Sequence, residues 1–241
     1  MTARSDDAPG DEAVLQTGAI ELVGLFRESS NSALLVDVCD DDGRTVRGVY
    51  KAEEGERPLR DFPPRIYRRE RAAYVLSEAL GWDLIPATVL RDEGPFGPGS
   101  IQRFVEHDPS EHYFTLYDSR PETHDALRRM AVFDVIANNT DRKAGHVLRG
   151  TDGHLWGIDQ GLCFSAPDKL RTVIWEFAGE PVPDPLLADL APLLERLPAE
   201  LEELLFPVEQ LALQLRVEML LATPVLPFDE TGGYRIPWPP L

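Results

Sequence analysis

The stretch from residue 134 to residue 164, DVIANNTDRKAGHVLRGTDGHLWGIDQGLCF, constrains the fold more than any other. It begins in a segment whose apolar residues recur at helical spacing, and it breaks at Asn138-Asn139-Thr140, residues that favour caps and turns. Asp152-Gly153 follows, and this dipeptide is the strongest short-range signal for a β-hairpin. The stretch therefore predicts a helix, a loop that carries Asp141, and a hairpin that carries Asp159 at its end.

Two carboxylates on neighbouring loops, with cationic side chains between them in the sequence, match what phosphoryl transfer requires. In that reaction one acid orients the attacking hydroxyl and another binds the metal ion that bridges the phosphates. Asp141 suits the first role and Asp159 the second, and we place Lys143 beside Asp141 as a catalytic cation. A solvated hairpin with an Asp-Gly turn would contain the same residues without any chemistry, so the spacing alone leaves both interpretations open.

The motifs in this stretch resemble the catalytic and metal-binding loops of the phosphatidylinositol 3- and 4-kinase superfamily. The superfamily pattern is D-R-x-x-x-N followed by I-D-F-G, and here Asp141-Arg142, His146 and Ile158-Asp159-Gln160-Gly161 follow it with a matching separation of the two aspartates. The wider stretch, with DRKAGHVL and KLRTVIWEF, resembles a compact actinobacterial branch of these kinase-like proteins. The resemblance implies that Asp141 is the catalytic-loop aspartate and that Asp159 binds the metal.

Two positions depart from the superfamily pattern. His146 replaces the metal-binding Asn, and Gln160 replaces the Phe that follows the metal-binding Asp. Neutral imidazole binds divalent metals but suits softer ions than Mg²⁺, so we expect His146 to be a ligand and Mn²⁺ to be an alternative to Mg²⁺. A buried structural histidine is the competing interpretation.

The N-terminal part of the chain alternates in a strand-like way from Val14, and strands are predicted at 19–25, 33–38 and 45–51. Lys51 ends the third strand, at the place of the kinase lysine that contacts the phosphates; a surface lysine on an edge strand is the alternative. The polar turn between the first two strands is expected to cover the phosphates of ATP, as in the superfamily, although a plain hairpin turn is the simpler interpretation. Its candidate residues are Ser29, Ser30 and Asn31.

A helix is predicted from residue 65 to residue 80, with Gly81 just beyond its end. Glu70 on this helix could pair with Lys51, as the helix-borne glutamate of kinases does, or could be a solvated residue among arginines. Two further strands are predicted at 85–90 and 100–105. The resemblance places the adenine-binding hinge in the second of them, at Gln102, Phe104 and Val105.

The C-terminal half reads as mainly helical. One helix is predicted from about Pro121 to Ala137, and leucine stripes predict more between residues 186 and 221, all of them core, with Asp184 as an N-cap. Residues 223–241 are rich in proline and are expected to wrap over a surface. Lys169 and Arg171 fall where kinases place the activation segment and could bind the acceptor or its phosphate; a solvated loop is the alternative.

The chain has 241 residues and a net charge of −18, so it repels nucleic acid and anionic membrane surfaces unless a basic patch intervenes. We therefore expect no nucleic-acid partner and no stable membrane association, and an acceptor that is a protein or a small-molecule hydroxyl rather than a lipid. Cys39 and Cys163 have no zinc spacing, and residues 1–11 lack the apolar run of a signal peptide. These features suggest a cytoplasmic protein.

Together these features predict an α+β, bilobal, protein-kinase-like fold with an antiparallel β-rich N-lobe and a mainly helical C-lobe. The expected divisions are a disordered tail (1–12), the N-lobe (13–106), the C-lobe (107–222) and a Pro-rich tail (223–241). The predicted function is ATP-dependent phosphoryl transfer to a hydroxyl with Mg²⁺ or Mn²⁺. Autophosphorylation at Ser29, Ser30 or Ser100 is a further hypothesis. A nucleotide-binding pseudokinase and a metal-dependent hydrolase are the alternatives.

Overall fold

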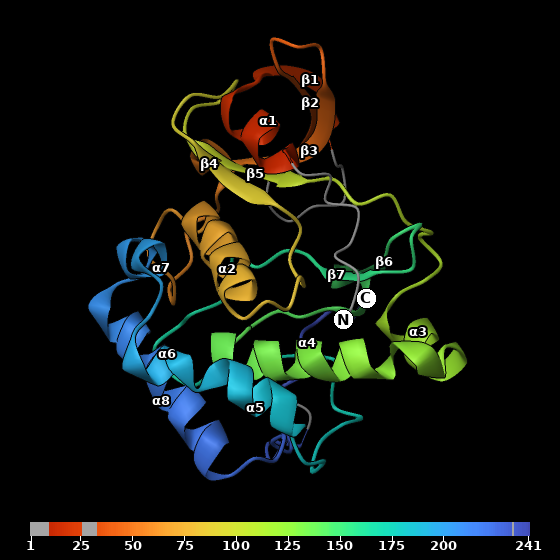
Figure 1. The fold of residues 1–241 in the computed structure, drawn as a ribbon, viewed down its shortest axis with the longest axis vertical. Coiled ribbons are helices and arrows are strands. Elements are labelled where there is room, and N and C mark those ends of the chain that lie inside the picture. The colour runs from red at the N-terminus through yellow and green to blue at the C-terminus, as the bar shows by residue number, and fades with distance from the viewer. Residues whose placement is uncertain (1–9, 26–32, 233) are drawn as a thin grey trace.

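An antiparallel sheet of five strands forms the N-terminal lobe, with the strands in the order β1-β2-β3-β5-β4 (Figure 1). The structure is a computed structural model that describes residues 10–25, 33–232 and 234–241. Strands β1, β2 and β3 pair antiparallel in sequence order, which confirms the predicted meander. The predicted strands at 85–90 and 100–105 are present in shorter form. The five strands are β1 (Ala19–Leu25), β2 (Ala33–Cys39), β3 (Thr45–Ala52), β4 (Thr88–Arg91) and β5 (Gly99–Arg103).

A short helix, α1 (Asp11–Thr17), precedes the sheet and packs on β2, β3, β4 and β5. Val14 and Leu15 are adjacent and both buried, which a half-buried strand does not allow because its neighbouring side chains point to opposite faces. Ion pairs from Asp11 to Arg44 and from Glu12 to Arg71 hold the first turn. The expected strand from Val14 and the expected disorder at residues 11 and 12 are therefore wrong.

Helix α2 (Tyr67–Ala79) lies between the sheet and the C-terminal lobe and confirms the helix predicted for residues 65–80 (Figure 1). Gly81 follows its end with a φ of 65°, a left-handed conformation that glycine adopts without strain. A short 3-10 helix, η1 (Glu53–Gly55), leads from β3 into the preceding loop. The Glu56 carboxylate there accepts the backbone N–H groups of Arg65 and Tyr67, both at 2.8 Å, and so caps the start of α2.

The first half of the C-terminal lobe carries the predicted helix and hairpin. Helix α3 (Tyr113–Ser119) and the 3-10 turn η2 (Pro121–Thr123) lead into α4 (His124–Ala137), which ends at Asn138 in a left-handed conformation. A 3-10 turn, η3 (Ala144–His146), leads into the hairpin of β6 (Val147–Arg149) and β7 (Leu155–Gly157). The loop that carries Asp141 therefore lies between α4 and β6, and Asp159 follows β7.

Four helices complete the lobe: α5 (Asp184–Leu190), α6 (Pro192–Glu195), α7 (Ala199–Leu204) and α8 (Pro207–Ala222). The first leucine stripe was expected to form one helix, but it is divided between α5 and α6 at Pro192, which has no backbone N–H to continue the helix. Asp184 is not the N-cap. It lies in the first turn of α5, where a carboxylate complements the helix dipole, and Pro183 occupies the cap position.

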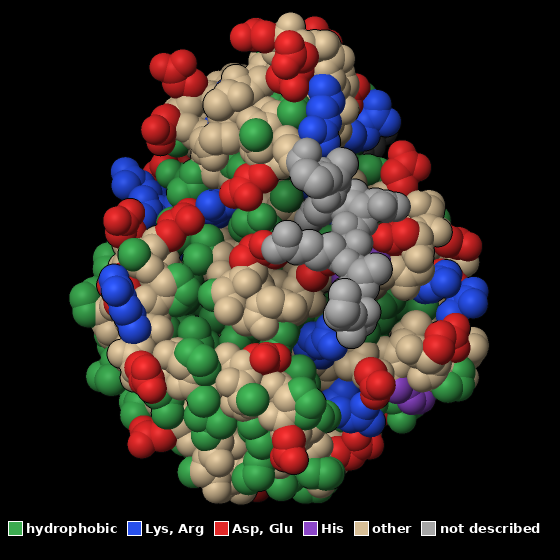
Figure 2. Space-filling view, viewed as in Figure 1, with side chains coloured by type: hydrophobic (Ala, Val, Ile, Leu, Met, Phe, Trp, Pro, Cys, Tyr) green, Lys and Arg blue, Asp and Glu red, His purple; other side chains and the backbone are tan. Residues whose placement is uncertain are grey.

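The leucine stripes are not core throughout. Leu186, Leu190, Leu193 and Leu197 are buried, but α8 turns a second apolar stripe to solvent. This stripe consists of Val208, Leu211, Leu215 and Met219, whose exposed fractions run from 47% to 71%. Leu194 on α6 is also 40% exposed. Figure 2 shows hydrophobic side chains gathered at the lower left, over the region of α8 in Figure 1.

One continuous core joins the two lobes, running from the sheet through α2 and α4 to the C-terminal helices. Residues 223–241 form neither helix nor strand in their described part, and they run over the C-lobe as expected. Backbone N–H groups of Thr172 and Ala144 donate to the carbonyls of Arg235 and Pro240 along this path. Among the described residues, none of the helices has the length and apolar character needed to cross a membrane.

Candidate functional site

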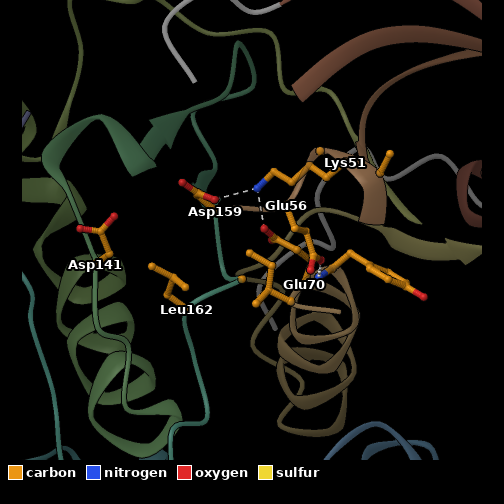
Figure 3. A pocket seen from close by; sticks show the side chains of 11 residues that line it. Lys51, Glu56, Glu70, Asp141, Asp159 and Leu162 are labelled. Atoms are coloured by element: carbon orange, nitrogen blue, oxygen red, sulfur yellow. Dashed lines mark hydrogen bonds and ion pairs between the residues drawn. The ribbon is translucent and has the colours of Figure 1, made fainter. Parts of the chain in front are cut away.

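Lys51 lies at the centre of an ion-pair cluster between the lobes. It is on β3, and its Nζ donates to Glu70 Oε1 on α2 at 2.5 Å and to Asp159 Oδ1 at 2.7 Å (Figure 3). Burial alone would lower the pKa of Lys51, but the two carboxylates outweigh it and raise this pKa. The structure therefore contains the expected contact between Lys51 and Glu70, and it adds a direct contact between Lys51 and Asp159.

Asp159 takes a backbone conformation that few residues adopt. Its φ is 60°, and its side chain is 43% exposed at the end of the β7 hairpin. Aspartate is among the few non-glycine residues that tolerate the left-handed region, and strain of this kind gathers at functional sites. The positive charge of Lys51 lowers the pKa of Asp159, so this group is a carboxylate at neutral pH.

His146 faces Asp159 from the turn η3, with its Nε2 3.4 Å from Asp159 Oδ2. Burial lowers the pKa of His146 to about 4, so its imidazole is neutral at pH 7. The backbone N–H of Lys143 lies 3.4 Å from His146 Nδ1, which makes Nδ1 the acceptor and directs the ring proton on Nε2 towards Asp159. Metal binding through Nε2 would require the other tautomer, at the cost of one long hydrogen bond.

Asp141 lies across the cavity from Lys51 (Figure 3). Its backbone N–H donates to Asn139 Oδ1 at 3.0 Å, and its carboxylate lies 3.3 Å from Lys143 Nζ with 29% of its side chain exposed. Burial raises the pKa of Asp141, and the cation of Lys143 opposes this shift. A carboxylate with a raised pKa that stays open to solvent can accept a hydrogen bond or a proton from an incoming hydroxyl.

The cavity between the lobes is lined by residues from β3, α2 and both loops (Figure 3). It includes four of the predicted site residues, which come from different segments: Lys51, Glu70, Asp141 and Asp159. The remaining lining residues are Ala52, Gly55, Glu56, Ile66, Tyr67, Gly161 and Leu162. A concave site with convergent charged groups and shifted pKa values is where a reactive ligand is expected to bind.

A family model and one curated relative match this chain. The model for phosphatidylinositol 3- and 4-kinase matches residues 64–217, which include α2, both loops and most of α8. Protein Rv2133c of Mycobacterium tuberculosis is 38% identical over 278 residues, covering 99% of this chain and 97% of the relative. The chain belongs to the phosphatidylinositol 3- and 4-kinase family.

Solved kinase structures share the fold of this family member. The Golgi casein kinase, solved with Mn/ADP bound, matches with a TM-score of 0.54 at 12% identity, over 97% of this chain and 79% of that one. The hydra Fam20 structure solved with sugar matches with a TM-score of 0.58 at 12% identity, over 92% and 89% of the two chains. At this identity the likeness shows the fold alone, and it confirms the predicted bilobal kinase-like architecture.

The hinge residues predicted from the kinase family do not line the cavity. Gln102 is buried in β5, where its Nε2 donates to Thr88 Oγ1 at 2.9 Å, and the N–H of Phe104 donates to the Arg47 carbonyl. Val105 is buried in a small cluster with Leu148 and Trp156. Ile158, which precedes Asp159 in the sequence, packs against this cluster. Their adenine-binding role stays a prediction. Ser29, Ser30 and Asn31 lie outside the described residues.

The residue that holds the two kinase loops together is Arg142, which the motif contained but the sequence could not explain. Its side chain is fully buried and ion-paired with Asp134 of α4. It also donates to the carbonyl of Ile158 at 3.1 Å and to Gln160 Oε1 at 3.2 Å. Gln160, at the position where the family pattern has Phe, is therefore a buried hydrogen-bond partner of Arg142. The sequence feature that points to a buried partner for Arg142 is Asp134, a single acidic residue within the apolar run MAVFDVIA.

Two other predicted residues have clear places. Lys169 is paired with Asp61 of the loop before α2 at 2.5 Å. Arg171 is exposed, and its charge contributes to lowering the pKa of Asp61 and opposes the raised pKa of Asp141. The chain has only three lysines: Lys51 lines the cavity, Lys143 pairs with Asp141 beside it, and Lys169 pairs with Asp61. Ser100 is buried in β5 at 1% exposure, so it is not the mobile phosphorylation site that was hypothesised.

Proposed function

We propose that this protein is an ATP-dependent phosphotransferase that moves the γ-phosphate of ATP to a hydroxyl acceptor. The observation that carries the proposal is the contact of Lys51 with both Glu70 and Asp159 in a cavity that Asp141 faces. Phosphoryl transfer requires a cation for the phosphates, a carboxylate for the metal and a second carboxylate for the acceptor, each fixed in place. Membership of a kinase family supports the same assignment.

The roles of the side chains follow from their charges. Lys51, held protonated by its two partners, would contact the phosphate oxygens, and Glu70 would keep its ammonium group in place. Asp141 would accept the hydrogen bond of the acceptor hydroxyl and orient its oxygen for attack. Lys143 would keep Asp141 ionised and place positive charge beside the transferred group.

The donor set suits a divalent cation. Asp159 and His146 are adjacent, and they would offer a carboxylate oxygen and, after the ring proton moves to Nδ1, the Nε2 of a neutral imidazole. Mg²⁺ is commonly bound by one or two protein ligands, with the phosphates and water supplying the rest. Such a cation would neutralise charge on the phosphate oxygens. An imidazole ligand favours Mn²⁺ relative to a site with an amide in its place.

The acceptor would bind on the side of Asp141 where Arg171 and Lys169 lie. These cations, with Lys143, give a locally basic rim in a chain whose net charge is −18. A hydroxyl acceptor carried by a protein or by a small molecule fits this rim. Autophosphorylation at Ser29 or Ser30 remains part of the proposal, and a phosphate-transfer assay followed by mass spectrometry would reveal it.

The test is thermal and chemical stability with ATP, with and without Mg²⁺ or Mn²⁺. A ligand that binds only the folded state adds about 2.7 kcal/mol at a hundredfold excess over its dissociation constant. We expect metal-dependent stabilisation by ATP in the unmodified chain and its loss in Lys51→Met and Asp159→Asn. Asp37→Asn is the matched control, because it removes a surface carboxylate that is paired with Arg47 on the same sheet.

The possible outcomes distinguish the alternatives. Stabilisation by ATP that needs no metal would replace the kinase with a nucleotide-binding regulator. Stabilisation by metal but not by ATP would favour a metal-dependent hydrolase. If Asp37→Asn loses the ATP effect together with Asp159→Asn, the loss would not be specific to the proposed site.

A further inference from the structure

Two adjacent residues of α2 hold the loop that follows Asp159. Glu70 Oε2 accepts the backbone N–H of Gln160 at 2.8 Å, and Arg69 Nε donates to the carbonyl of Cys163 at 3.0 Å. Since Glu70 also holds Lys51, the position of α2 sets both the ammonium group and the carboxylate of the site. Any rotation of α2 about its axis would therefore disturb the whole cluster.

Arg69 is itself anchored to the C-terminal lobe. Its guanidinium donates to Glu209 Oε1 at the start of α8, and the side chains of the two residues are only 5% and 7% exposed. The other oxygen of Glu209 accepts the N–H of Phe206 at 2.9 Å, which fixes the carboxylate. The ring of Phe62 packs against the guanidinium at 5.4 Å and shields it from water. Arg69 therefore ties α2 to α8 and to the loop at Cys163.

A buried ion pair is a poor device for stability alone. Removing two charges from water is costly, and well-packed apolar residues of similar volume often serve stability as well or better. The hydrogen bonds of a buried guanidinium are directional, so they fix the orientation of both partners in a way that an apolar contact does not. We propose that Arg69 and Glu209 are positioning residues that hold α2 in the rotation at which Glu70 meets Lys51 and Gln160, without any bound ligand.

The catalytic part of this inference rests on the proposed function, and the structural part does not. Arg71, two residues further along the same helix, provides the contrast. It is also charged and also reaches the C-terminal lobe, through Glu200 of α7, but its partners Glu12 and Glu200 are each 45% exposed. Its hydrogen bonds within the described residues go to Glu12, Glu200 and the carbonyl of Thr88, and none of these belongs to the loop of Asp159. Arg71 can support the packing of α2 without setting its rotation.

The experiment uses the double variant Arg69→Met/Glu209→Leu, which replaces the pair by apolar side chains of comparable size. We expect a urea unfolding midpoint close to that of the unmodified chain, because the burial is kept. Hydrogen exchange of the Gln160 amide should be about tenfold faster, because its acceptor on Glu70 is no longer held. With ATP as substrate, kcat should fall about tenfold, because the misplaced charges stabilise the transferred phosphoryl group less in the transition state.

Three further variants make the test specific. Arg71→Met should leave the exchange of the Gln160 amide and kcat within twofold of the unmodified chain. Glu209→Gln keeps an oxygen that accepts from Arg69 and should retain most of kcat, and Arg69→Lys keeps the charge but loses the fork and should fall between. Each of the two residues is thus tested by a conservative and a disruptive change.

The inference is overturned if the double variant folds and shows unchanged exchange at Gln160, since the pair would then be only a packing feature. It is also overturned if Arg71→Met changes exchange and kcat as much as the double variant does. If the double variant does not fold, Arg69→Lys decides, and normal exchange there would count against the role. If no variant, nor the unmodified chain, binds ATP, the proposed function fails while the exchange measurement still decides the positioning role.

Discussion

Two of the ion pairs at the site, Arg142–Asp134 and Lys51–Asp159, differ in burial, in hydrogen bonding and in backbone conformation. Arg142 and Asp134 are fully buried, and the carboxylate also accepts hydrogen bonds from Asn139 and Thr172. Lys51 and Asp159 are partly exposed at 21% and 43%, and Asp159 has a left-handed backbone. Protein partners surround the first pair on all sides. The second pair is partly accessible from the cavity, so its charged groups can still meet a ligand.

This difference separates support from chemistry. A saturated buried pair cannot bind a ligand without losing its own hydrogen bonds, so Arg142 and Asp134 hold the loops in register. A half-exposed pair keeps its charges available for a nucleotide and a metal, at the cost of contributing little to stability. The same reasoning assigns the substitutions below to stability or to function.

The largest expected effect is on the supporting pair. Asp134→Leu leaves the charge of Arg142 buried without compensation, and we expect a loss of about 3–5 kcal/mol in the free energy of unfolding. Asp159→Asn, on the exposed pair, should cost less than about 1 kcal/mol. Urea denaturation of both variants measures this. Similar losses for the two would break the division between support and chemistry.

A smaller effect on stability concerns His146, whose side chain faces Asp159 and whose carbonyl accepts from Arg142. Its pKa is about 4 in the folded chain and 6.5 without burial, so the unfolded state binds more protons between these values. Stability is therefore lost as the pH falls from 6.5 towards 4, by roughly 1–2 kcal/mol at pH 5. His146→Asn should lose that much less stability between pH 7 and pH 5. Urea titrations with EDTA present measure this, and the difference should vanish between pH 7 and pH 8.

The smallest effect is on Asp141. Its pKa is raised by burial and held down by Lys143, so Lys143→Gln should raise this pKa further. In the proposed mechanism the carboxylate of Asp141 is the active form, so the acid limb of the profile of kcat/KM against pH should move to higher pH. Arg128→Gln, which breaks a surface pair with Asp125 and Glu180, should leave the limb in place. A shift to lower pH would contradict the assignment of Lys143.

The sequence was informative where chemistry and spacing coincide. Asp141 and Asp159 could be predicted because the helix end, the Asp-Gly turn and the family motif each place them, and Lys51 because its strand ends there. Glu70 followed from helical spacing and the family pattern. These residues lie on local elements whose direction the sequence determines.

What depends on partners distant in sequence could not be predicted. Arg142 and Gln160 look like solvated polar residues until the fold buries them against Asp134. The sequence favours a strand at Val14 because the seven residues of α1 include only two buried apolar side chains, and the packing of this helix against β4 leaves no mark on the local sequence. The two-sided apolar pattern of α8 likewise gives no sign of which stripe is covered.

The small number of lysines, two of which are Lys51 in the cavity and Lys143 beside Asp141, has a consequence for covalent chemistry. Arginine supplies every other cationic side chain apart from histidine, so reagents and modifications that select primary amines have only Lys51, Lys143 and Lys169 as side-chain targets. Acylation of Lys143 or Lys169 would remove positive charge where an anionic reactant approaches. Acylation of Lys51 would leave two carboxylates facing each other. Acylation at Lys51 or Lys143 would therefore change the charge balance around the cavity.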